Sequence, residues 1–136
     1  MSLKTYCEKH NIDPQKAIQI VFGETGGLLP KARGYTGYMV EITDTSIILE
    51  NEKFGEKKEI PFSSFSKADF GIGSGNLWLQ CIVDDRPFIF CATRGAWKSP
   101  AAKLLMQKIG EHTEVEGMKE YKHFTGKLFI FYTLIN

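Results

Sequence analysis

The side chains of this chain that could bind a metal ion or attack a substrate are its three cysteines and three histidines. Cys7 and His10 stand three positions apart, so on a helix they would share a face and could supply two metal ligands. His112, His123 and the other cysteines provide no second pair with comparable spacing, and no histidine lies in a recognisable nucleophile motif. We therefore expect no metal, no cofactor and no catalytic residue, and we interpret Cys7 and His10 as a half-buried amphipathic face.

Gly71, Gly73 and Gly75 have a spacing that superficially matches nucleotide-binding loops. A dinucleotide loop, however, must open a helix directly after a strand, and these glycines lead into Leu-Trp-Leu at 77–79, which is typical of a strand. We expect residues 71–76 to form a flexible connector.

A weak anion-binding site is a further hypothesis, placed just before a predicted helix. Arg94 and Lys98 carry positive charge, Trp97 could offer a flat apolar contact, and a helix that begins at Ser99 presents free backbone N–H groups and a favourable dipole. The alternative, which we favour, is that Trp97 packs in the core and both cations are solvated.

The composition fits one domain over residues 1–136, long enough to bury a self-sufficient core. Seventeen basic and sixteen acidic side chains leave a formal charge of +1, so we expect no nucleic-acid partner. Three cysteines, an odd number, argue against a disulfide framework. The amino terminus lacks the apolar run of a secretory signal, and the longest apolar stretch, 128–135, is far shorter than the ~20 residues that span a bilayer. We expect a cytoplasmic protein.

The first half of the chain predicts a helix over 2–10 and then an ambiguous segment. Asp13 and Pro14 are typical of a helix start, which favours a second helix ending near Gly23, but residues 14–22 also fit a strand. A hairpin follows, with strands 35–43 and 46–51 about a turn at Asp44 and Thr45. Residues 50–59 are charged and predict a solvated turn and sheet edge, before Ile-Pro-Phe at 60–62 returns to the core.

The second half predicts a hairpin with strands 77–83 and 86–92 about the turn Asp84-Asp85. A helix follows, with Ser99 as N-cap and Gly110 just past its end. Residues 113–116 fit a capping box for a short helix to about residue 123. Residues 128–132 are aromatic and β-branched, so we predict a last strand there.

The two hairpins and the helix need each other for burial. We predict one connected core that contains Val40, Ile42, Leu49, Leu79, Phe88, Phe90, Leu105 and Ile109. The second hairpin is also apolar on its other face, where its pattern places Trp78, Ile82, Ile89 and Cys91. We expect the amino-terminal helices, the tail or a second copy of the chain to cover this face, with Leu128, Phe129 and Phe131 of the tail as further interface candidates.

Residues 38–49, Tyr-Met-Val-Glu-Ile-Thr-Asp-Thr-Ser-Ile-Ile-Leu, and 59–65, Glu-Ile-Pro-Phe-Ser-Ser-Phe, together with the helix after Ser99, resemble bacterial pleckstrin-homology-like (PH-like) domains. The resemblance covers about residues 35–110. It implies an α+β fold, a PH-like barrel of two packed antiparallel sheets closed by a helix, here with an amino-terminal helical extension and a carboxy-terminal helix-strand extension.

The expected function is a non-catalytic binding or assembly module that works by protein–protein interaction or self-association. The alternative is a β-barrel that holds a small apolar ligand. Lipid-binding relatives of PH-like domains place Lys and Arg around the first strand turn, where this chain has Asp44 and Thr45, so we expect no phosphoinositide or membrane binding.

Overall fold

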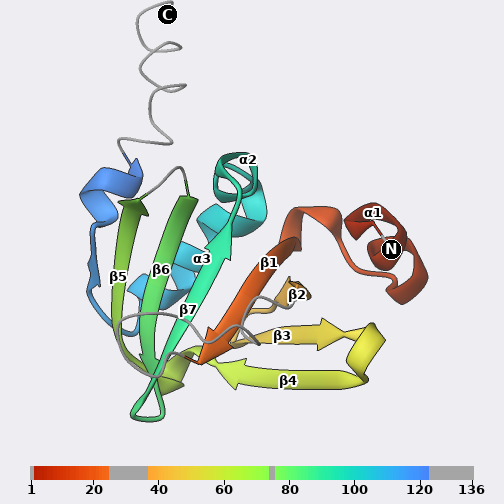
Figure 1. Cartoon of the computed structure of the whole chain (residues 1–136), viewed down its shortest axis with the longest axis horizontal. Coiled ribbons are helices and arrows are strands. Elements are labelled where there is room, and N and C mark those ends of the chain that lie inside the picture. Colours follow the sequence, from red (N-terminus) through yellow and green to blue (C-terminus); the bar gives the residue numbers. More distant parts are fainter. Residues whose placement is uncertain (1, 25–36, 74–75, 123–136) are drawn as a thin grey trace, which may run out of the picture.

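The computed structural model describes residues 2–24, 37–73 and 76–122, and these form an α+β fold built on one eight-stranded sheet (Figure 1). The strand order across the sheet is β4-β3-β2-β1-β7-β6-β5-β8. The strands are β1 Ala17–Glu24, β2 Gly37–Ile42, β3 Ser46–Asn51, β4 Glu56–Pro61, β5 Phe65–Gly73, β6 Asn76–Val83, β7 Arg86–Ala92 and β8 Val115–Glu116.

Strand β1 lies in the middle of the sheet and joins its two halves, β2 to β4 and β5 to β8. Its first part pairs with β2, from Ala17 opposite Glu41 to Val21 opposite Gly37. From Val21 onward it pairs with β7, again antiparallel. In Figure 1, β5, β6 and β7 run across the direction of β3 and β4, and β1 passes diagonally between them. The sheet is therefore strongly curved, and its concave side can enclose a core.

Helix α3, Pro100–Gly110, supplies the helical side of that core. Ser99 caps it as predicted, accepting a hydrogen bond from the Ala102 amide at 3.3 Å, and Pro100 is its first residue. Gly110, predicted just past the end, is the last residue of the helix. Leu105, Met106 and Ile109 are buried in one cluster with the inward side chains of the strands.

The predicted core is confirmed by that cluster. Seven of the eight predicted residues are buried in it, and Phe88 packs against it while half-buried. Phe62, Phe90 and Trp97 are the bulkiest of its fully buried side chains. The Trp97 and Phe70 rings pack edge to face with their centroids 5.5 Å apart, and the Tyr121 and Phe70 rings do the same with their centroids 5.0 Å apart.

Helix α1, Leu3–His10, also matches the prediction. Ser2 is its N-cap, and Asn11 ends it in the left-handed conformation, at a φ of 56°. Tyr6 and Cys7 bury one of its faces, so the expected amphipathic face is present. The short helix α2, Arg94–Trp97, lies directly before α3.

The helix predicted over residues 14–22 is wrong, and the strand alternative is confirmed. Asp13 caps only a short 3₁₀ turn, Pro14–Lys16, after which β1 begins. The segment forms a strand because it pairs with a strand on each side. Ile18 and Ile20 point inward and Gln19 between them is exposed, as the alternation of side chains along a strand requires.

The connector predicted over residues 71–76 is wrong at most of its positions. Gly71 to Gly73 continue β5, and Asn76 already begins β6, with Gly73 opposite Asn76. Pairing along the whole length of β6 outweighs the weak strand propensity of the glycines.

The capping box predicted at residues 113–116 is not formed. The Thr113 hydroxyl donates to the Ser66 carbonyl instead, and β8 pairs in parallel with β5 at Ala68 and Asp69. A helical segment follows at 118–122, within the range predicted for a helix. The strand predicted at 128–132 lies outside the described residues.

Both predicted hairpin turns are confirmed. Asp84 and Asp85 have φ values of 51° and 64°, as a two-residue turn with the twist of its strands requires, and Val83 pairs with Arg86. In the first hairpin, the Thr43 amide donates to the Ser46 carbonyl at 2.8 Å. Within the described ranges, no helix is long and apolar enough to cross a membrane.

Candidate functional site

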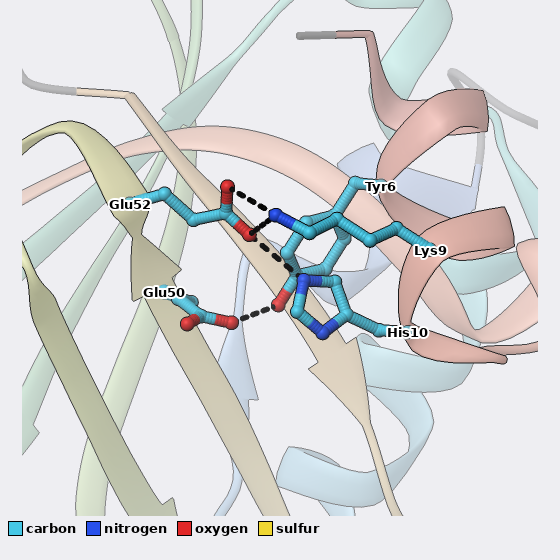
Figure 2. A network of polar contacts seen from close by, with 5 residues as sticks. All are labelled: Tyr6, Lys9, His10, Glu50 and Glu52. Atoms are coloured by element: carbon cyan, nitrogen blue, oxygen red, sulfur yellow. Dashed lines mark hydrogen bonds and ion pairs between the residues drawn. The ribbon is translucent and has the colours of Figure 1, made fainter.

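A polar cluster joins the last turn of α1 to the end of β3. Helix α1 is held against the sheet by buried Tyr6 and Cys7, which directs the side chains of Lys9 and His10 toward Glu50 and Glu52 (Figure 2). Glu50 belongs to β3, and Glu52 follows directly after that strand. The cluster therefore depends on a contact between residues more than 40 positions apart.

Glu52 is the centre of the cluster. Its Oε1 lies 2.8 Å from His10 Nε2, and its Oε2 lies 3.3 Å from Lys9 Nζ. The hydrogen bond with His10, followed by that with Lys9, holds the pKa of the Glu52 carboxyl below its ordinary value. Because all three side chains are well exposed, the ion pairs contribute little to stability.

Tyr6 fixes the second carboxylate. Its phenol donates a hydrogen bond to Glu50 Oε1 at 2.6 Å. Burial, and then this hydrogen bond, raise the pKa of Tyr6, so the phenol stays protonated and remains a donor. The Tyr6 and His10 rings also pack together, with centroids 4.4 Å apart.

His10, Glu50 and Glu52 are the described residues that could hold a metal ion. One donor atom from each lies within 4.8 Å of the other two. Cys7, the partner of His10 in the sequence pattern, is buried against the sheet, and burial raises the pKa of its thiol. The structure thus pairs His10 with the carboxylate of Glu52, directly after β3, rather than with Cys7.

A groove lies on the outer face of β1, between the amino-terminal helix and α2. Its volume is about 580 Å³, and its apolar lining includes Leu3, Ala17, Val21, Cys91 and Ala96. The strand register continues this surface across the sheet, because Val21 pairs with Cys91 and Cys91 pairs with Trp78. These three side chains are half-buried.

The interface candidates of the second hairpin lie in two environments. Trp78 and Ile82 are half-buried on the outer face, and Ile89, which lies on the same face opposite Gln80, is buried, with 4% of its surface exposed. Leu128, Phe129 and Phe131 lie outside the described residues. The segment 115–122 covers the β5 edge of the sheet, through β8 and the buried Tyr121.

The residues of the anion-site hypothesis differ in their exposure to solvent. Trp97 is fully buried, as in the alternative that we favour, and its carbonyl accepts a hydrogen bond from the Tyr121 hydroxyl at 2.7 Å. Arg94 and Lys98 are exposed. The Ser99 hydroxyl donates to the Ala96 carbonyl and caps the Ala102 amide.

The cysteines have no features of nucleophiles. Cys81 is buried in the core, and burial alone raises the pKa of its thiol. Cys91 lies on the opposite face of the hairpin, as predicted, and partial burial raises its pKa too. Nucleophilic cysteines need the reverse shift.

Comparison with known proteins finds no family model and no curated protein that matches this chain. The site is therefore interpreted from its own geometry. Sequence reasoning missed the pairing of His10 with Glu52. The sequence shows basic residues in the last turn of α1 and acidic residues at and directly after the end of β3. These charges do not reveal which residues pair until the position of the helix on the sheet is known.

Proposed function

We propose that this chain is a non-catalytic binding or assembly module of PH-like architecture, which works through self-association. The proposal is supported by the antiparallel meander β1 to β4, the second meander β5 to β7, and a following helix that packs in the core. This order of elements resembles the PH-like barrel, in which two packed sheets are closed by a helix.

The observation that supports self-association is the apolar outer face of the second hairpin. Val21, Cys91 and Trp78 form a half-buried row that continues into the groove beside Ala96. Ile89 and Ile82 lie on the same face nearer the Asp84-Asp85 turn, with exposed Gln80 between Trp78 and Ile82. An antiparallel sheet normally presents a polar outer face to water, and a continuous apolar surface marks an interface.

A second copy of the chain is the occupant that we propose for this face. The formal charge of +1 puts almost no electrostatic repulsion between copies. The small-ligand alternative has less support, because Phe62, Phe90 and Trp97 fill the concave side of the sheet.

The test is light scattering on the full chain and on Ile82→Lys. We expect the wild-type protein to be dimeric or larger at micromolar concentration and Ile82→Lys to be monomeric, because a charge on this face must be desolvated in the interface. Gln107→Lys adds the same charge on the exposed side of α3 and should leave the mass unchanged. Circular dichroism verifies that both variants are folded.

A monomeric wild-type chain would contradict self-association, and so would an Ile82→Lys variant that is folded and still oligomeric. Native mass spectrometry of the same samples distinguishes the alternative, since a retained small apolar molecule would favour the ligand-binding barrel.

A further inference from the structure

Three possible metal ligands meet where α1 contacts the sheet. His10 comes from the end of the helix, Glu50 from the end of β3, and Glu52 from the turn that follows directly after it (Figure 2). Their donor atoms lie within 4.8 Å of one another, and His10 Nε2 is 2.8 Å from Glu52 Oε1. Donors around a tetrahedral zinc ion stand about 3.3–3.6 Å apart, given bonds of about 2.0–2.2 Å. Small side-chain rotations would therefore bring all three within bonding distance of one ion.

Tyr6, which is not itself one of the three donors, holds two of them in place. Buried Tyr6 donates to Glu50 Oε1 at 2.6 Å and packs its ring against the His10 imidazole. A single fixed side chain thus orients two of the three donors, as the hydrogen-bonded outer groups of protein metal sites do. The second oxygen of Glu50 remains available for an ion.

We propose that His10, Glu50 and Glu52 form a binding site for a divalent transition-metal ion of the zinc class. One imidazole with two carboxylates suits Zn²⁺, Co²⁺ or Ni²⁺, whereas Ca²⁺ and Mg²⁺ prefer sites made of oxygen donors alone. Three protein ligands leave a fourth position for water.

Lys9 allows a test in which a substitution should increase the affinity for the metal ion. Its ammonium group lies 3.3 Å from Glu52 Oε2, where it would compete with a metal ion for the carboxylate. The Lys9 side chain is 56% exposed, so it can turn into water at small cost. Removing this lysine should therefore strengthen metal binding, although it weakens the ion pair.

The test is a Zn²⁺ titration of the full chain without an affinity tag, followed by calorimetry and by the shift in melting temperature. Co²⁺ absorption in the visible range reports the coordination geometry. We expect Zn²⁺ to raise the melting temperature, because a metal that bridges α1 and β3 binds only the folded chain. His10→Gln and Glu52→Gln should each weaken binding by at least about tenfold, and Tyr6→Phe by about tenfold, the usual effect of an outer-shell partner.

Lys9→Met separates a metal site from a purely structural polar cluster, since it should bind Zn²⁺ several-fold more tightly than the wild type. His112→Gln and His123→Gln, which change the other histidines, should bind as the wild type does. The proposal is overturned if about 1 mM Zn²⁺, a weak-binding limit, leaves the melting temperature unchanged. It is also overturned if His10→Gln, folded by circular dichroism, binds like the wild type, or if Lys9→Met binds more weakly.

Discussion

Gly117 lies between β8 and the helical segment at 118–122, with a φ of 78°. A side chain at this position would run into the carbonyl group of Phe70 in β5. We predict that Gly117→Ala destabilises the protein by about 1–3 kcal/mol or more, because it adds backbone strain to a steric clash. Urea denaturation measures the effect.

Gly95 is the matched control for that substitution. It lies in α2 without a positive φ, and apart from its chain neighbours and the backbone of its own helix, no atom is within 4 Å of a Cβ built on it. Gly95→Ala should be neutral or stabilising by up to about 1 kcal/mol, because alanine favours a helix. Equal losses in both variants would mean that the approach of 115–122 to β5 is not the cause.

Tyr38 is the residue whose ionisation should be visible at alkaline pH. Burial, and then its hydrogen bond to Glu56 at 2.6 Å, raise the pKa of its phenol from 10.0 to about 12. A raised pKa means that the fold favours the neutral phenol, so this stabilisation is complete below pH 10 and is lost as the pH rises toward 12.

Two measurements check the Tyr38 prediction. Absorbance at about 295 nm, where tyrosinate absorbs, should lose a late-titrating component in Tyr38→Phe. The difference in unfolding free energy between the wild type and Tyr38→Phe should shrink above pH 10. A Tyr38 phenol that titrates near its ordinary pKa would show that its bond to Glu56 is not formed.

Among the elements, strand β7 gives the clearest test of the predicted β6–β7 pairing, because this pairing decides which of its side chains are buried. Phe90 is fully buried opposite Leu79, whereas Phe88, two positions earlier, is half-buried. We predict that Phe90→Ala lowers the unfolding free energy by ~3–5 kcal/mol. Phe88→Ala should cost clearly less, and chemical denaturation of the two variants gives the comparison. A loss below about 1 kcal/mol for Phe90→Ala would contradict the register.

Elements defined by local signals could be predicted from the sequence. Ser99 and Pro100 mark the start of α3, and Asp84-Asp85 marks a turn, because these residues act on their own neighbours. Strand β1 could not, because its partners lie far along the chain, and the glycines of β5 could not, because glycine has a weak strand propensity that pairing with β6 overrides. Val21 pairs with both Gly37 and Cys91, and no local pattern contains that information. The polar cluster at His10 could not be predicted for the same reason, because His10 and Glu52 are 42 positions apart.

At the scale of the whole molecule, the outermost of the described strands is relevant to how two copies could meet. Strand β4 ends the sheet and carries Glu-Lys-Lys-Glu at 56–59, all exposed. In an antiparallel pair of two β4 strands centred between Lys57 and Lys58, every one of these charges would face its own kind. Like charges on an edge discourage such pairing, so the edge of β4 does not compete in this register with the outer face proposed above for self-association.

The position of β1 also has a consequence for synthesis. Translation begins at the amino terminus, so β1 leaves the ribosome well before β7, whose Cys91 is its partner at Val21. Until then, β1 can pair only with β2, and the end of the strand toward Glu24 has no β7 partner. The nascent chain therefore carries an open strand edge for about 70 residues of elongation, which takes several seconds at the usual rate of about 5–20 residues per second. A pause in this interval would expose the chain to aggregation, and the late closure also predicts slow folding, because the deciding contacts are distant in sequence.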